Sequence, residues 1–318
     1  MKKIFIALVA LATIAACDKA QVVEAPQGDA IAFGDAFVDN STKVIYNEAD
    51  NIKGFKVWGN VDGTNTTPVA LYPNAGADVT RGSAGLGAAW TCSVARYWTP
   101  SASYNFVAIA NGTGTELANG IPTKISYSIN STDPADLIYG ATTAETNEDA
   151  VPVEGVNTSN VVTFTMEHLL SRLQVAFQNE LSEGYTYDIK NVKVTALKEG
   201  VYTINDEEWN TVGQTAEDLV YGELEDLAPT NDATALAAAH LIIPGSAITI
   251  SFDYDLELNS TVIYSKSVTN QSVPLVSAKG YSYTINVQLQ AGNRIEFSVI
   301  ENDDENSLTW GNGSTQNI

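Results

Sequence analysis

Apolar and polar residues alternate in short runs along most of this chain, and turn-forming residues separate the runs. The clearest runs lie at residues 30–38, 124–130, 189–197, 281–290 and 294–300. Alternation with a period of two is typical of β-strands with one buried face. Because such runs recur about every 8–12 residues without a sustained helical period, the pattern predicts an all-β fold of β-sandwich type.

The length of 318 residues is enough for two such sandwiches in tandem. A polar, acidic stretch at 142–160 suggests where they divide, so we expect an N-terminal domain at 30–158 and a C-terminal domain at 159–318. Two segments interrupt the strand pattern. We expect the acidic residues 207–226 to form a loop and the alanine-rich residues 233–239 to form a helical turn.

The first residues have the features of an export signal. Lys2 and Lys3 precede an apolar run at 4–16, which is shorter than the roughly 20 residues that span a bilayer. The run ends Ile-Ala-Ala-Cys, which resembles the lipobox of bacterial lipoproteins and makes Cys17 the lipid acceptor. We therefore predict a signal peptide at 1–16, a tether at 17–29, and anchoring by acyl chains, each buried methylene contributing about 0.8 kcal/mol. An ordinary signal peptide with a chance cysteine is the alternative.

Net charge and cysteine content limit which partners the chain can bind and what can stabilise its fold. A net charge of −22 argues against nucleic acid as a partner, since binding it requires clustered basic residues. If Cys17 carries lipid, Cys92 is alone and no internal disulfide forms, so burial of the core has to stabilise the fold. Cys92 lies in an alternating apolar stretch and is interpreted as a structural thiol.

Catalytic and ligand-binding motifs are weak in this sequence. His168 and His240 lack metal-ligand spacing, and we interpret both as structural. We assign no catalytic residue, cofactor or metal, and we expect no enzymatic activity. The acidic run at 301–306 is interpreted as a solvated turn rather than a calcium site. The five tryptophans are expected to fill the core, and a surface lipoprotein that binds glycans through exposed tryptophans stays open as the alternative function.

Several segments together resemble the fimbrillin family, the type V pilus subunits of Bacteroidota. After the lipobox they are FKVW at 55–58, RYWTP at 96–100, YNFVA at 104–108, DLIY at 136–139, FTMEHLLSRLQV at 164–175, LIIP at 241–244, YSYTINV at 281–287 and LTW at 308–310. The resemblance implies two transthyretin-like β-sandwich domains. It also implies an outer-membrane lipoprotein precursor that assembles with other pilus subunits into adhesive surface fimbriae and contacts host or bacterial surface receptors.

The family mechanism is donor-strand exchange. In that mechanism a trypsin-like protease cuts the loop after the first strand, and a C-terminal segment of another subunit fills the groove that this strand leaves. Here the resemblance implies a donor region at 294–300 and 308–318, although the tail at 311–318 is mostly polar. No arginine precedes Arg81, so Lys43 is the candidate processing site. A subunit that is not cut is an anchor or accessory protein instead.

Overall fold

The computed structural model describes residues 29–34, 37–38, 54–63, 67–81, 90–130, 134–157, 160–245, 247–273, 279–301 and 315–317. The strands are β1 (Ala32–Phe33), β2 (Phe37–Val38), β3 (Gly54–Gly63), β4 (Val69–Ala70), β5 (Ala77–Arg81), β6 (Trp90–Cys92), β7 (Ala102–Ala110), β8 (Thr113–Ala118), β9 (Ile121–Ser128), β10 (Ile138–Thr146), β11 (Pro152–Glu154), β12 (Val161–Val162), β13 (Thr165–His168), β14 (Ser171–Asn179), β15 (Tyr185–Leu197), β16 (Glu199–Thr203), β17 (Glu208–Asn210), β18 (Ala216–Leu227), β19 (Thr234–Ile242), β20 (Ile248–Leu258), β21 (Thr261–Val273), β22 (Ser282–Gln290), β23 (Arg294–Glu301) and β24 (Thr315–Asn317).

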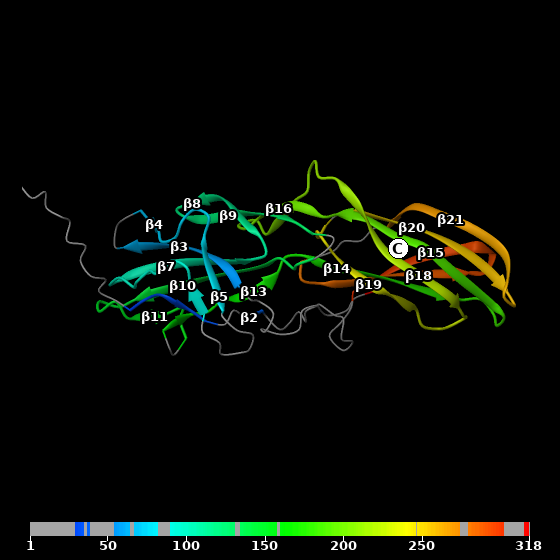
Figure 1. Ribbon diagram of the computed structural model, residues 1–318, viewed down its shortest axis with the longest axis horizontal. Coiled ribbons are helices and arrows are strands. Elements are labelled where there is room, and N and C mark those ends of the chain that lie inside the picture. Colours follow the sequence, from blue (N-terminus) through cyan, green and yellow to red (C-terminus); the bar gives the residue numbers. More distant parts are fainter. Residues whose placement is uncertain are drawn as a thin grey trace, which may run out of the picture.

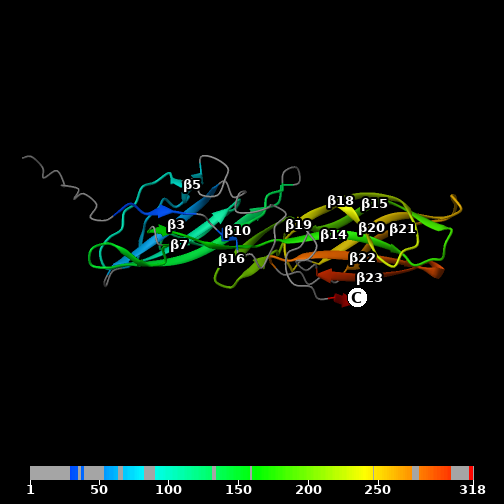
Figure 2. The same ribbon diagram turned by 90° about the horizontal axis from the view of Figure 1, so that it is seen from below.

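These strands form an elongated molecule of two lobes that lie end to end (Figures 1 and 2). One short 3₁₀ turn, η1 (Ala291–Asn293), is the helical element among the described residues. Within the same ranges, no helix has the length and apolar character needed to cross a membrane. The predicted all-β fold of two tandem β-sandwiches is confirmed.

The N-terminal lobe is organised around a nine-stranded sheet in the order β2-β13-β10-β7-β3-β5-β6, to which β4 and β11 add short pairs. Its central strand β7 is buried on both faces. Tyr104 and Phe106 pack into one core, whereas Val107 and Ile109 pack into a second core on the opposite face. The sheet β17-β16-β9-β8 covers this second core, so the lobe is thicker than a single pair of sheets.

The C-terminal lobe is a sandwich of the sheets β19-β14-β22-β23-β24 and β18-β15-β20-β21. Strand β20 illustrates its construction, because Ile250, Phe252 and Tyr254 are buried while the residues between them stay partly exposed. β14 runs parallel to β22 along 172–179 and antiparallel to β19. β14 is buried on nearly every residue and does not show clean alternation, which is typical of a strand covered on both faces.

Two expectations about local structure are wrong. The acidic segment expected to be a loop contains β18, in which Leu219 and Tyr221 face the core and the acidic residues face outward. The alanine-rich segment expected to be helical lies in β19 and pairs with β14. Pairing with a neighbouring strand outweighs the modest intrinsic helix preference of alanine.

Strands from the second half of the sequence complete the N-terminal lobe. β13 pairs with β10, and β16 of the β16–β17 hairpin pairs with β9. Lys279 fastens these elements to the C-terminal lobe, since its ammonium lies 3.1 Å from Glu167, 2.7 Å from Glu207 and 3.1 Å from the hydroxyl of Tyr202. Strands after residue 159 thus pair with strands before residue 158. The domain boundary between residues 158 and 159 stays a prediction.

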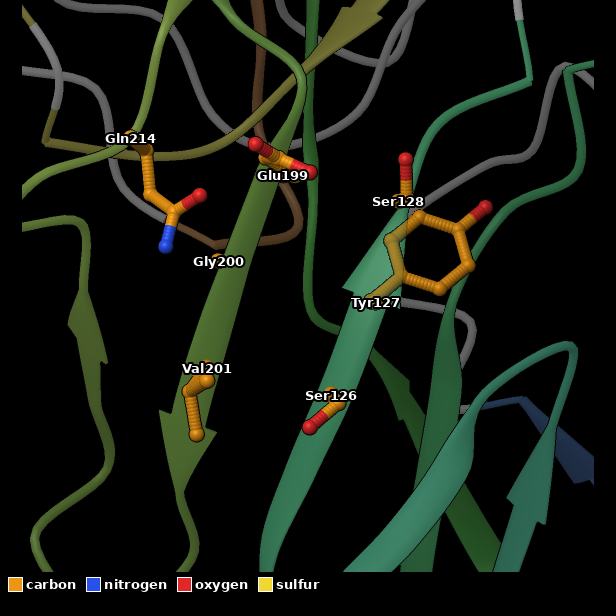
Figure 3. Close-up of a pocket in the computed structure, with 7 residues that line it drawn as sticks. All are labelled: Ser126, Tyr127, Ser128, Glu199, Gly200, Val201 and Gln214. Atoms are coloured by element: carbon orange, nitrogen blue, oxygen red, sulfur yellow. The ribbon is translucent and has the colours of Figure 1, made fainter.

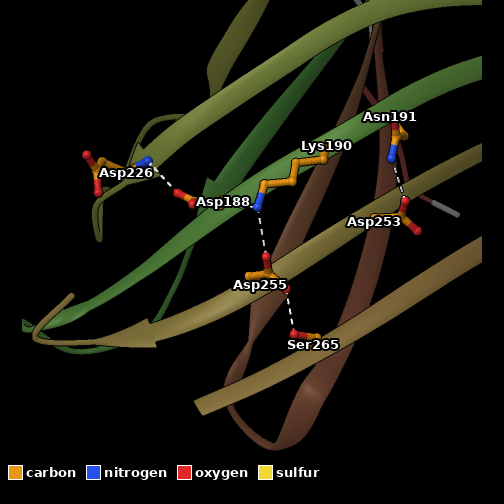
Figure 4. A network of polar contacts seen from close by, with 7 residues as sticks. All are labelled: Asp188, Lys190, Asn191, Asp226, Asp253, Asp255 and Ser265. Carbon is orange, nitrogen blue, oxygen red and sulfur yellow. Dashed lines mark hydrogen bonds and ion pairs between the residues drawn. The ribbon is translucent and has the colours of Figure 1, made fainter. Parts of the chain in front are cut away.

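The outer face of the sheet β18-β15-β20-β21 carries a polar network (Figure 4). Lys190 Nζ lies 2.8 Å from Asp255, and the hydroxyl of Ser265 donates to the same carboxylate at 2.6 Å. These two donors hold the pKa of Asp255 below its usual 3.8. On the same face, the amide of Asn191 donates to Asp253 at 2.7 Å.

The substitution Asp255→Asn tests how much this surface network stabilises the fold. Because the pair is exposed to water, we expect the free energy of unfolding to fall by less than about 1 kcal/mol at neutral pH. A carboxylate with a lowered folded-state pKa contributes stability above its unfolded pKa and loses it as the pH falls through the folded pKa. The difference between wild type and variant therefore begins to shrink as the pH falls below 3.8, and it disappears once the pH is below the folded-state pKa of Asp255. Urea denaturation at neutral pH and in acid measures this difference in the free energy of unfolding, with Glu225→Gln as the charge-matched control. A loss of stability in Asp255→Asn that persists in acid contradicts the interpretation.

Candidate strand-assembly site

The first described segment, residues 29–34, is held in the N-terminal lobe on two sides. On one side, the backbone N–H of Ile31 donates to the carbonyl of Arg96 at 2.8 Å, and that of Trp98 donates to Asp29 at 3.0 Å. On the other side, β1 pairs in parallel with β12, and the N–H of Gly34 donates to Val162 at 2.9 Å. β2 continues the same direction and pairs in parallel with β13. The segment thus fills a slot between two parts of the lobe.

The side chains of this segment complete the core beneath it. Ile31 and Phe33 are each only 5% exposed, as expected for alternate residues on the buried face of the alternating run at 30–38. The ring of Phe33 lies among four aromatic rings, with centroid distances of 5.9–6.4 Å. Those rings belong to Phe55, Tyr72, Phe106 and Phe164. Full burial of one such side chain stabilises a fold by about 1.5–3 kcal/mol.

A contrast between backbone and side chains makes this segment unusual. β1 and β2 have two residues each; β1 pairs only with β12, and β2 lies at the edge of the nine-stranded sheet. Ile31 and Phe33 are nevertheless buried in the core. The adjacent strands β10-β7-β3-β5 of the nine-stranded sheet pair with one another without this segment. The segment can therefore leave without breaking the central sheet, but its departure uncovers an apolar slot with unpaired backbone groups on both sides.

The C-terminal edge of the other lobe holds the predicted donor region. Residues 294–300 belong to β23, which pairs antiparallel with β22 and buries Val299. β24 pairs with β23 only through Ser298, Val299 and Ile300. The last described residues are thus attached to the sheet by a very short strand, whereas 294–300 are integrated into the lobe.

The two sequence-predicted modification sites, Cys17 and Lys43, lie outside the described residues, as do Trp310 and the acidic residues 302–306. Cys92 is half-buried, its thiol donates to the carbonyl of Val94 at 3.3 Å, and burial raises its pKa. These contacts agree with a structural thiol.

Both histidines make structural contacts. His168 is buried and its Nδ1 contacts the carboxylate of Asp136. Burial raises the pKa of Asp136, and the neighbouring imidazole opposes this shift. His240 donates through Nε2 to the carbonyl of Val220 at 2.9 Å, and burial lowers its pKa. Across the described ranges, no group of three or more histidine, cysteine or acidic side chains is arranged to hold a metal ion.

The described tryptophans do not form a row on the surface. Trp58 and Trp98 are fully buried in the N-terminal lobe. Trp209 is half-buried, and its indole donates to the carbonyl of Leu169 at 2.9 Å. Trp90 is also half-buried and lies with its ring 5.4 Å from that of Phe55. These four rings pack in or against the core and do not make a flat platform for stacking sugars.

A shallow pocket of about 350 Å³ lies over the paired strands β9 and β16 (Figure 3). Its lining residues are Ser126, Tyr127, Ser128, Glu199, Gly200, Val201 and Gln214. Glu199 is the single carboxylate among them, so the pocket lacks the pair of carboxylates that glycoside hydrolysis uses.

The aromatic surroundings of Phe33 are the part of this site that sequence reasoning missed. Phe55, Phe106 and Phe164 come from β3, from β7 and from the segment before β13. Each was visible as an apolar position in a strand-like run, but alternation does not say which strands become neighbours. The large aromatic residues in these strand-like runs were the available signal.

Comparison with known proteins agrees with this architecture. The model of a family described as fimbrillin-like matches residues 41–302. A crystal structure of a fimbrial protein from Bacteroides vulgatus is similar, with a TM-score of 0.61 at 16% sequence identity, covering 86% of this chain and 98% of that one. The fimbrial anchor protein Mfa2 from Porphyromonas gingivalis aligns over 88% of this chain and 98% of its own, with 9% identity and a TM-score of 0.37. The curated proteins include no significant match. Since the family model spans most of the sequence, the chain belongs to the fimbrillin-like family.

Proposed function

We propose that this chain is a structural, non-enzymatic pilin subunit that assembles into adhesive surface fimbriae by donor-strand exchange. The observation that carries the proposal is the slot filled by residues 29–34. Few backbone pairs hold this segment, while Ile31 and Phe33 fill a deep apolar site. A strand from a neighbouring subunit that enters the same slot regains both the backbone hydrogen bonds and the apolar burial, which is the basis of β-strand addition.

Export and processing complete the proposed pathway. The precursor is carried to the outer membrane by a lipid on Cys17, and its acyl chains hold it there. Cleavage after Lys43 then separates the first strand from β3, which begins at Gly54. The non-covalent contacts of residues 29–34 and 37–38 then retain the first strand. The freed slot takes a strand from the C-terminal region of the next subunit, and the polymer extends from the cell surface.

Limited trypsin digestion of the folded mature chain tests this function. We expect one early cut after Lys43, followed by ladders that resist SDS. The variant Lys43→Gln is the matched control and is expected to stay monomeric. Wild-type protein that is cut at Lys43 and still forms no ladders contradicts assembly by donor-strand exchange. Resistance of Lys43 to the protease instead points to an anchor or accessory subunit.

A further inference from the structure

β21 is the longest edge strand among the described residues. Its 13 residues pair with β20 on one side, and no described strand pairs with its other side. It lies along the margin of the C-terminal lobe (Figure 1). The opposite edge of the same sheet is β18, which lies against β19, since His240 of β19 donates to the carbonyl of Val220. Within the described part of the chain, β21 thus has an unpaired row of backbone N–H and C=O groups.

The composition of β21 favours pairing with another strand. It contains no proline, glycine or acidic residue, and it begins with threonine, valine, isoleucine and tyrosine, which are all common in strands. Val262 and Ile263 are each 51% exposed, and Tyr264 is 37% exposed. Exposed segments with this composition and little charge associate edge to edge with other chains.

Lys266 is the single charged residue of β21. It lies opposite Tyr254 of β20, whose ring is buried in the core, so the lysine is on the core-facing side of the sheet. Its neighbour Ser265 is on the outer side, where its hydroxyl donates to Asp255 (Figure 4). Charged side chains that point inward from an edge strand are a known means of preventing a further strand from pairing there.

The regular part of this edge is short, and Lys266 lies at its centre. The register of β21 with β20 shifts at residues 262–264 and again at residues 268–271, and Asn270 has a φ of +49°. Such bulges interrupt the ladder and twist an edge strand. Between them, residues 264–268 remain for regular pairing. Two copies that pair antiparallel about the centre of this stretch place their lysines opposite one another, where like charges repel.

Lys266 also lacks a carboxylate that could neutralise it. Each of the other lysines in the described ranges forms an ion pair, whereas Lys266 forms none within the same ranges. A strand added beside β21 therefore covers an unpaired ammonium group, which opposes the pairing because a desolvated charge without a partner is unfavourable.

We propose that Lys266 protects the edge of the C-terminal lobe, so that β21 does not pair with β21 of a second copy of this chain. A charge of either sign at this position gives the protection, and an uncharged residue removes it. The protection does not depend on the proposed function, since it keeps any two folded copies apart. Where strands are exchanged, it directs strand addition away from β21.

The substitution Lys266→Thr in the uncut mature chain tests the proposal. Threonine suits a strand and stays polar, so the charge is the main property that is lost. We expect the variant to form a closed dimer through two antiparallel β21 strands, at a protein concentration roughly tenfold or more below any at which wild type associates. Size-exclusion chromatography with light scattering measures the mass over a concentration series, and circular dichroism checks that the fold is kept.

Three further variants locate the effect. Lys266→Glu keeps a charge on the edge and is expected to stay monomeric. Lys193→Thr loses the same charge from the central strand β15, where Lys193 pairs with Asp218, and is also expected to stay monomeric. Lys266→Thr/Ile263→Lys returns a charge to another exposed position of β21 and is expected to restore the monomer.

Two results overturn the proposal. The first is a Lys266→Thr protein that stays as monomeric as wild type. The second is a dimer that Ile263→Lys leaves intact or that Lys193→Thr forms equally well, because such a dimer does not use the edge of β21. All of these positions lie in the C-terminal lobe, so the outcome is separate from the ladders that test the proposed function.

Discussion

Replacing Phe33 with alanine is expected to lower the free energy of unfolding of the N-terminal lobe by about 3–5 kcal/mol. The ring of Phe33 lies 5.9 Å from that of Phe106 and 6.1 Å from that of Phe164, so its removal leaves a cavity that neighbouring strands cannot close. Because the ring belongs to a marginally paired segment, we also expect the variant to release its first strand sooner after cleavage and to form ladders faster. Urea denaturation and time-resolved gels measure these two effects.

The control for this variant is its neighbour Ala32→Ser, which changes an exposed position on the same strand. We expect Ala32→Ser to unfold and assemble like wild type, because its side chain does not enter the core. The C-terminal lobe has its own core, so its unfolding is expected to be unchanged in both variants. If the Phe33→Ala protein is as stable as wild type, the ring of Phe33 does not stabilise the N-terminal core.

The first strand shows what a sequence pattern can and cannot predict. Alternation predicts a strand with one buried face at residues 30–38; the structure has the short strands β1 and β2 within that range, with Ile31 and Phe33 buried. Alternation did not reveal that the strand pairs in parallel with Val161 and Val162, which come from the other side of the proposed domain boundary. The alternation of apolar and polar residues reflects which side chains of one strand face the core. Strand pairing depends on the global topology, so only the structure reveals the slot.

β18 shows the opposite limit of the same reasoning. Its acidic residues suggested a solvated loop, yet only one face of an outer strand has to be apolar. Leu219, Tyr221 and Leu227 supply that face and are enough to attach the strand to the core. Composition averaged over both faces therefore does not reveal the strand.

Substituting His168 with leucine is expected to destabilise the N-terminal lobe by about 3–5 kcal/mol, because it leaves the carboxylate of Asp136 buried beside an apolar group. The two side chains are 0% and 3% exposed, so water cannot replace the lost partner without opening the lobe. The pair joins the start of β10 to the end of β13, next to a backbone hydrogen bond of 2.9 Å between Leu169 and Leu137. Urea denaturation at pH 7 measures the loss.

A second substitution separates the charge from the packing. Removing both members of a buried pair and replacing them with apolar groups is much less costly than removing one. The double variant Asp136→Leu/His168→Leu is therefore expected to be more stable than His168→Leu alone. His240→Leu, which removes one hydrogen bond to the Val220 carbonyl at a half-buried position, is expected to cost only about 1 kcal/mol. If His168→Leu costs no more than His240→Leu, the Asp136–His168 pair does not stabilise the junction of β10 and β13, and packing of Leu137 and Leu169 alone holds these strands together.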